Sequence, residues 1–446
     1  MKKTLGYVAI ALAAVVITVV IFRYYTGLTA PTKVPKSATT VLQINLRQLE
    51  KNLLLDLLSH PLKYRRQKRK RSDSLKRKYK SLTQGVSIPK AMYFYRMPNY
   101  PGWHSVPLTL SNRQTFESFL NKEGLLASVY EEVSIFSMNQ IHFYLRENEL
   151  VIGVSEQPIQ EQRHTLFTAT QYMASDNETL VNLVNSSADL TLGLSSGELI
   201  TGTFEKGRFV LDGTLGPSFD GLLTTTHAHA PGDIVGLDFK LNTEASVVPT
   251  WLSDNLNERF EKFTHLAVDS IAPALNGSLS MRLTAVKTVQ DTIVTYAYDD
   301  NFNKVETMSF QQSTRPDARL ALGLEKQARL YDYFVQQEAI QLVESRPVFT
   351  PIPVYSLRPE EVNDQFVLTT GEVAEAAEFE VIKFAFKFRP AAYLEQPLEI
   401  PLSAAVKRFF AMTASIEMMV DNKNQLSGAI VFLNPYRNFL AQLIRP

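Results

Sequence analysis

Two short motifs contain residue types and spacings that could support chemistry. The run GLSSG at residues 193–197 fits the G-x-S-x-G pattern of a nucleophile elbow, in which a strained turn between a strand and a long helix exposes the central serine. The run HAH at residues 227–229 would place two imidazoles on one face of a strand, as a pair of metal ligands requires. The first motif would belong to a hydrolase and the second to a metal site.

Neither motif has the partners that its chemistry needs. The stretch that follows Ser195 is short and interrupted by glycine and threonine, so a strand that enters a turn is favoured over an elbow. No third ligand is evident near His227 and His229, and this run also fits an exposed strand end. The sequence has no glycine-rich phosphate loop and no recognisable pair of catalytic carboxylates. We therefore predict that the chain is not an enzyme and uses no cofactor or metal.

The positive charge of the chain is concentrated in one segment. The net charge is only +1, yet the segment from Lys63 to Lys80 contains eleven Lys or Arg and one Asp. A solvated helix is one interpretation. Contact with anionic lipid or an acidic protein is the other, whereas nucleic acid is not expected. The residues expected to touch such a surface are Arg65, Arg66, Lys68, Arg69, Lys70 and Arg71.

The N-terminus has the length and polarity of a membrane-spanning helix. The uncharged run from Leu5 to Phe22 would measure roughly 27 Å as a helix, close to the hydrocarbon thickness of a bilayer. A cleaved signal peptide is disfavoured because the apolar run is too long and no small-x-small site follows it. The chain has no cysteine, which excludes a lipid attached to a thiol. We expect a single-pass protein with a cytoplasmic N-terminus and a periplasmic C-terminal domain.

Beyond this run, strand-like stretches are repeatedly followed by helix-like ones. Examples are the strand pattern at Thr39–Leu46, followed by leucines at helical spacing, and the stretches Ser187–Ile200 and Phe379–Leu394. A hairpin is indicated where Ile141–Arg146 meets Leu150–Ser155. Further strand pairs are indicated around Leu279 with Thr292, and around Ala414 with Leu426.

These patterns predict an α+β fold: an N-terminal transmembrane helix followed by mainly antiparallel sheets with packed helices, in two or more related subdomains. The expected boundaries are residues 1–25 for the anchor and 26–37 for a linker. Residues 38–200 then form a first α+β subdomain that includes a basic helix at 60–82, and residues 201–446 form a second α+β region.

The order of these pieces resembles the uncharacterised extracytoplasmic domains of unknown function found in bacterial membrane-anchored proteins and lipoproteins. The segments that carry the resemblance are Val34–Leu49, Gly85–Tyr95, His142–Glu156, Ser187–Leu199 and Ser427–Ile444. The resemblance implies a place outside the cytoplasmic membrane and an α+β fold of repeated units. It implies no functional residues.

The sequence therefore favours a membrane-tethered protein of the cell envelope that binds or scaffolds other envelope components. One alternative is a protein that binds lipid or another hydrophobic ligand in a cavity between sheet and helices. The stripe Leu252, Leu256, Phe260 and Phe263 could line such a cavity, although packing in a core is the commoner use of this spacing. The other alternative is a serine hydrolase that uses Ser195.

Overall fold

The structure is a computed structural model that describes most of the chain beyond residue 30. The described residues are 31, 33–61, 85–98, 100–159, 163–169, 171–216, 219, 221–229, 234–244, 261–262, 264, 266–298, 304–343, 345–352, 356–371, 378–396 and 402–444.

The chain divides into two compact units, and the sequence of the second is inserted into that of the first. The first unit takes the chain up to Lys206, together with Leu211–Thr214 and Arg437–Arg445. The second takes Gly207–Val210 and Leu215–Tyr436. The strand β11 (Arg208–Thr214) contributes residues to both.

The first unit is built on antiparallel strands. They are β1 (Thr40–Ile44), β2 (Met92–Arg96), β3 (Trp103–Ser105), β4 (Leu108–Thr109), β5 (Ser128–Tyr130), β6 (Val133–Met138), β7 (Ile141–Arg146), β8 (Glu149–Val154), β9 (Leu190–Leu194) and β10 (Leu199–Phe204). Neighbouring strands follow the order β5-β6-β7-β8-β3-β2-β1-β9-β10, and β4 also pairs with β8. Side chains alternate between the two faces of such a sheet, so each face needs its own cover.

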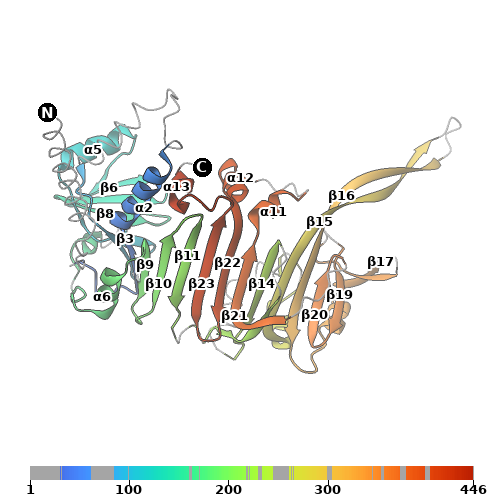
Figure 1. The fold of residues 1–446 in the computed structure, drawn as a ribbon. Coiled ribbons are helices and arrows are strands. Elements are labelled where there is room, and N and C mark those ends of the chain that lie inside the picture. The colour runs from blue at the N-terminus through green and yellow to red at the C-terminus, as the bar shows by residue number, and fades with distance from the viewer. Residues whose placement is uncertain are drawn as a thin grey trace, which may run out of the picture. The chain divides into compact units, whose positions relative to one another are not determined.

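Two helices cover opposite faces of this sheet (Figure 1). The helix α6 (Glu178–Asn185) buries Leu180 and Leu183 in a cluster with Val41 and Tyr95. The helix α5 (Arg113–Lys122) buries its apolar side chains in a separate cluster with Leu145 and Leu150, which point to the other face. Each helix begins at an asparagine whose side chain accepts a backbone N–H of the first turn.

A third helix of the first unit, α2 (Leu46–Ser59), turns its polar side inward. Its only buried residue is Asp56. The Oδ1 atom of Asp56 accepts the Asn438 N–H at 2.8 Å, and its Oδ2 atom lies 3.7 Å from Arg437 Nε. One turn earlier, Asn52 donates from Nδ2 to Asp189 Oδ1 at 2.9 Å. These polar contacts fix the orientation of the helix, and α13 (Phe439–Ile444) follows directly after the partners of Asp56.

The second unit is also antiparallel. Its strands are β12 (Leu223–Thr224), β13 (Thr226–His229), β14 (Val235–Leu241), β15 (Leu275–Tyr298), β16 (Lys304–Leu324), β17 (Ile340–Val343), β18 (Arg346–Phe349), β19 (Arg358–Val362), β20 (Gln365–Thr369), β21 (Glu378–Phe388), β22 (Thr413–Asp421) and β23 (Gln425–Phe432). The order β23-β22-β21-β14-β15-β16-β20-β19 runs across the sheet, while β12 pairs with β14, β13 pairs with β21, and β17 and β18 form a separate hairpin.

Short helices pack near the ends of this sheet. They are α9 (Val268–Ile271), α10 (Leu330–Gln336), α11 (Pro390–Leu394) and α12 (Ala404–Met412). At β20, the Phe334 ring of α10 lies 5.0 Å from that of Phe366 and 5.3 Å from that of Phe349. At β21, the Phe410 ring of α12 lies 5.2 Å from that of Phe388. These aromatic contacts fasten α10 to β20 and α12 to β21.

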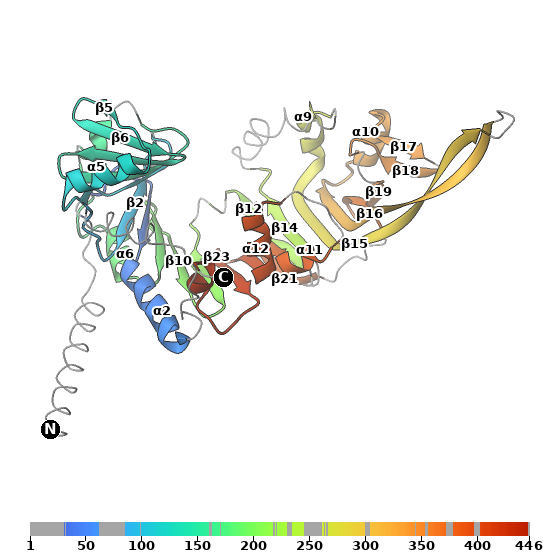
Figure 2. The ribbon, with the colours of Figure 1, turned by 90° about the horizontal axis from the view of Figure 1, so that it is seen from above.

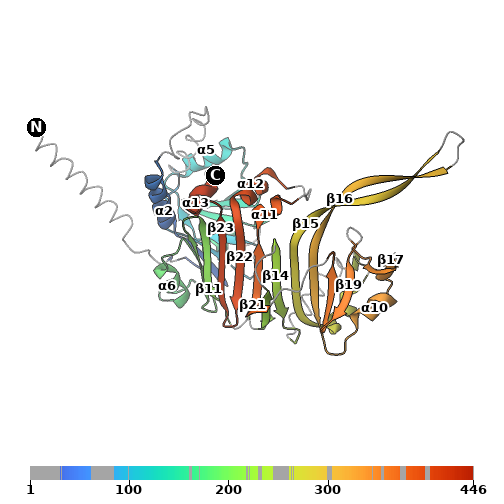
Figure 3. The same ribbon diagram turned by 45° about the vertical axis from the view of Figure 1, so that its right-hand side comes forward.

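The hairpin β15–β16 extends beyond its neighbours (Figure 3). Residues 285–298 pair only with residues 304–317 among the described strands, because β14 and β20 contact the other ends of β15 and β16. Several apolar side chains on this two-stranded part are exposed: Val294, Tyr296, Val305, Met308 and Phe310.

The predicted fold class, α+β with an N-terminal transmembrane helix, is wrong for the described chain, which is mostly antiparallel sheet with short helices. The predicted strand–helix repeat is wrong where a tight turn is followed by a second strand instead of a helix. Ser187–Ile200, for example, forms β9 and the start of β10, because Leu194 N donates to Glu198 O and Gly197 takes φ 97° in a tight turn. The stretches around Leu279 and Thr292 do not pair with each other, since both belong to β15.

The predicted anchor Leu5–Phe22 lies outside the described residues. Among the helices that the structure describes, none is both long enough and apolar enough to cross a membrane. Most of the predicted basic helix at 60–82 is likewise outside the described ranges.

The clamp around Asp56 gives a first prediction. Replacing Asp56 with Ala leaves the Asn438 N–H without its acceptor and Arg437 without a nearby carboxylate, so the first unit should lose roughly 3 kcal/mol of unfolding free energy. Urea unfolding followed by Trp103 fluorescence in a Trp251→Phe background would measure this, because the chain has only these two tryptophans.

Asp176→Ala, which removes an exposed carboxylate elsewhere in the same unit, is the matched control and should change stability by less than about 0.5 kcal/mol. Equal effects of the two substitutions would show that the buried carboxylate does not hold α2.

Candidate ligand-binding site

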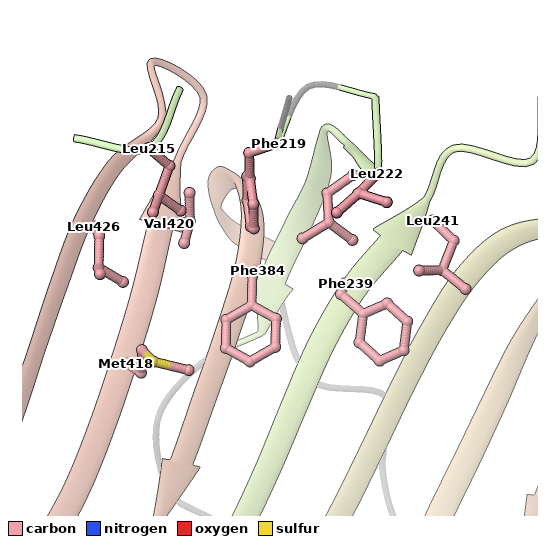
Figure 4. Close-up of a pocket in the computed structure, with 10 residues that line it drawn as sticks. Leu215, Phe219, Leu222, Phe239, Leu241, Phe384, Met418, Val420 and Leu426 are labelled. Carbon is pink, nitrogen blue, oxygen red and sulfur yellow. The ribbon is translucent and has the colours of Figure 1, made fainter. Parts of the chain in front are cut away.

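An apolar hollow lies within the second unit. It has a volume of about 660 Å³. Its lining side chains are all apolar (Figure 4): Leu215, Phe219, Leu222, Leu223, Phe239, Leu241, Phe384, Met418, Val420 and Leu426. Strands β14, β21, β22 and β23 form its floor, and the segment before β12 lies over it.

Strand register explains why these side chains converge. Phe239 of β14 is directly opposite Phe384 of β21, which is opposite Val420 of β22, and Val420 is opposite Leu426 of β23. Directly opposite residues point to the same face, so one row of four apolar side chains crosses four strands. The rings of Phe239 and Phe384 stack with centroids 6.5 Å apart. Met418 continues the face one pleat further along β22.

The described residues before and at the start of β12 (215–216, 219 and 221–223), here called the strap, lie over the hollow from the other side. Backbone hydrogen bonds hold both its ends: Leu215 N donates to Asn424 O at 2.9 Å, and Asn242 N donates to Leu222 O at 2.8 Å. Figure 4 shows Leu215, Phe219 and Leu222 directed toward the floor. Tied ends with apolar side chains between them make the strap a cover over the sheet.

The side chains that line the hollow differ in their exposure to solvent. Leu223, Val420 and Leu426 are buried, whereas Phe239 and Phe384 are half-buried and Leu222 remains 39% exposed. Leu222 therefore marks the mouth. No lining side chain offers a hydrogen-bond donor or acceptor other than the weakly accepting sulfur of Met418, so contacts inside the hollow are almost purely hydrophobic.

A buried ion pair lies on the opposite face of the sheet. The carboxylate of Asp238 contacts the Arg282 guanidinium at 2.6 Å, and both side chains are buried. Because Asp238 alternates with Phe239, the pleat separates this ion pair from the hollow. Lys383 donates to Asn424 Oδ1 at 2.6 Å and is buried at a β-bulge between Ile382 and Phe384.

A second unusual cluster lies in the first unit, on the face covered by α6. Gln43, Tyr95 and His104 are fully buried, and their side-chain polar atoms have no hydrogen-bond partner in the described structure. Burial lowers the pKa of His104 to about 4, helped by nearby His142, so this imidazole is neutral at neutral pH. Burial likewise raises the pKa of the Tyr95 hydroxyl. Buried polar atoms without a partner cost free energy, so this cluster is a place where the fold leaves hydrogen-bonding groups unsatisfied.

The residues predicted from the sequence do not form a catalytic or metal site. Ser195 lies in the turn between β9 and β10, where its N–H donates to Thr39 O at 2.9 Å, so a strand rather than a long helix follows it. His227 and His229 belong to β13, and among the described residues no group of three or more potential ligands could hold a metal ion.

Two predicted sets lie outside the described residues. They are the basic set Arg65, Arg66, Lys68, Arg69, Lys70 and Arg71, and the apolar stripe Leu252, Leu256, Phe260 and Phe263. The role of the first set therefore stays a prediction.

Sequence reasoning missed the hollow itself. Phe384 was within the expected stretch Phe379–Leu394, but Phe239 is about 145 residues away in the sequence and only the pairing of their strands brings the two rings together. The alternation of apolar and polar residues in β14 and β21 was the one available signal, and it does not identify the partner strand.

Comparisons with known proteins add no function. No family model matches the chain, and no curated protein sequence matches it. The chain is similar to solved structures of TP0453 in crystal forms I and IV, with 9% and 11% sequence identity and TM-scores of 0.22 and 0.24. The matches cover 76% and 78% of this chain and 90% and 94% of those chains. Likeness at these TM-scores supports no conclusion.

The neutral imidazole of His104 gives a second prediction. Its folded-state pKa of about 4 lies below the usual value, so stability present above pH 6.5 is lost as pH falls toward 4. Relative to wild type, His104→Leu should gain roughly 3 kcal/mol between pH 7 and pH 4, as measured by urea unfolding at both pH values.

At pH 7 the same variant should lie within about 1 kcal/mol of wild type or be more stable, because it removes buried polar atoms that lack partners. His164→Leu, at an exposed position of the same unit, is the control. A severe loss of stability at pH 7 for His104→Leu alone would show that the imidazole binds water or a ligand in the folded protein.

Proposed function

We propose that the second unit binds a hydrophobic ligand with a long alkyl chain, held between the strap and strands β14 and β21–β23. The observation that carries the proposal is the wholly apolar lining of a hollow of about 660 Å³. This volume falls within the range of roughly 300–1,000 Å³ typical of small-molecule sites. Such sites usually add a few polar groups to fix orientation, and their absence from this lining favours hydrocarbon over a polar ligand.

An ordinary packing defect is a poor account of the hollow. Cavities produced by truncating one core side chain reach about 150 Å³ and already destabilise a protein measurably. The hollow here is several times larger and opens at Leu222. Filling it with hydrocarbon would contribute roughly 0.8 kcal/mol per methylene removed from water. About fifteen methylenes would therefore contribute roughly 12 kcal/mol, which reaches micromolar affinity when association costs about 4 kcal/mol.

The charged face of the sheet supports the same assignment. The Asp238–Arg282 pair points away from the hollow, and no charged residue lines it. A polar head group would have to remain near the exposed mouth. The envelope scaffold predicted from the sequence, its extracytoplasmic location and its protein partners stay predictions beside this proposal.

A third prediction tests the hollow by filling its mouth. Leu222→Trp adds aromatic volume at a half-open position, where it should occupy the ligand's space without overpacking the buried wall. We expect its affinity for radiolabelled hexadecanoic acid to fall about tenfold or more, as measured by equilibrium dialysis of the full chain.

Leu342→Trp is the matched control, because Leu342 is 76% exposed on β17 and does not line the hollow. It should bind as wild type does. Wild-type protein that fails to bind the fatty acid, or binding that Leu222→Trp leaves unchanged while circular dichroism shows a native fold, would exclude this site.

A further inference from the structure

The outward side of α2 is a continuous apolar surface. Leu54, Leu55, Leu57 and Leu58, here called the leucine face, are between 38% and 67% exposed. At 3.6 residues per turn they span an arc of about 160° over the last two turns of the helix. Figure 2 shows α2 at the border of its unit, with one side away from the strands.

The helix cannot bury these leucines by rotating. Asp56 lies on the opposite side and contacts Asn438 and Arg437, while Asn52 contacts Asp189. Any rotation that hid the leucines would move a carboxylate away from its buried partners, which is costly. The leucine face is therefore presented outward by the fold, as the reverse of an ordinary surface helix.

Helix α13, which contacts α2, adds apolar surface to the same unit. Its Leu443 is 40% exposed and its Ile444 is 60% exposed, while Phe439 is buried against Phe204. Helix α13 is therefore held by Phe439, while Leu443 and Ile444 remain exposed to solvent.

We propose that the leucine face inserts into the interfacial region of an anionic lipid bilayer. The basic run that follows α2 in the sequence supports an anionic bilayer as the partner of the leucine face. The run of eleven Lys or Arg with one Asp begins at Lys63, only a few residues after α2 ends at Ser59. An apolar helical face next to a basic stretch is the pattern of helices that lie in the plane of an anionic membrane surface.

The chemistry of the face favours lipid over a protein partner. Protein interfaces concentrate their binding energy in Trp, Tyr and Arg, and leucine is under-represented among such residues. The leucine face contains neither an aromatic nor an arginine. Asp56 points inward, and the exposed Glu50, one turn before the leucines on the same side of α2, is accompanied there by Arg47 and Lys51. In interfacial helices the apolar face lies about 5–10 Å deep, at the boundary between head groups and acyl chains, and the leucine face would occupy this position.

The absence of cysteine from the chain allows a direct test. In the full-length protein, Leu58→Cys labelled with a nitrobenzoxadiazole fluorophore places one probe on the leucine face. Leu126→Cys, at a position 86% exposed after α5 in the same unit, is the matched control. Vesicles of phosphatidylcholine with about 30% phosphatidylglycerol carry a brominated lipid that quenches only fluorophores within the bilayer.

We expect about twofold or greater quenching of the label at position 58 on anionic vesicles, little on pure phosphatidylcholine, and none at position 126. The preference for anionic vesicles should disappear when Arg65, Arg66, Lys68, Arg69, Lys70 and Arg71 are changed to Gln. If that variant keeps the preference, the choice of an anionic surface is overturned.

Three further results would overturn the proposal. They are absence of quenching at position 58, equal quenching at positions 58 and 126, and shielding of position 58 from aqueous iodide without vesicles. Shielding that rises with protein concentration would identify a second copy as the occupant, and constant shielding would identify another part of the chain. The readout does not involve the hollow of the second unit, so the two proposals stand or fall separately.

Discussion

The need to satisfy buried carboxylates organises the first unit. Asp189 receives the Asn45 N–H on its carbonyl at 2.8 Å, while its carboxylate accepts from Asn52 Nδ2 at 2.9 Å and from Phe204 N at 2.6 Å. Burial raises the pKa of Asp189 to about 6 in spite of these donors. Together with Asp56, this residue joins the end of β1, the helix α2 and the end of β10. The hydrogen bonds of buried polar groups, rather than the burial of leucines, therefore determine which side of α2 faces the rest of the unit.

In the second unit the pleat of the sheet decides the chemistry. Alternation places the side chain of Phe239 on one face of β14 and that of Asp238 on the other. The apolar face is covered by the strap, and a hollow remains between them. Hydrophobic binding surface and buried ion pairs thus arise from the same strands without interfering with each other.

Local patterns in the sequence predicted local structure well. The hairpin expected at Ile141–Arg146 and Leu150–Ser155 is β7 with β8, and the pair expected around Ala414 and Leu426 is β22 with β23. Each has alternating β-type residues and a short turn, so nearby residues contain the whole signal. Contacts between distant segments were not predictable. Helix α2 is oriented by residues 437 and 438, and β14 pairs with β21 although β15 to β20 separate the two strands in the sequence. Fold class failed for this reason, since only long-range pairing distinguishes a broad antiparallel sheet from strand–helix repeats.

The insertion of one unit into the sequence of the other has a consequence for biosynthesis. Asp56 leaves the ribosome 382 residues before Asn438. At typical elongation rates this interval is roughly 20 to 75 s. The strands of the first sheet are complete once Phe204 has been made, and the second unit is then translated before the segment that holds α2. The first unit therefore begins to fold first but is completed only after the second has been translated.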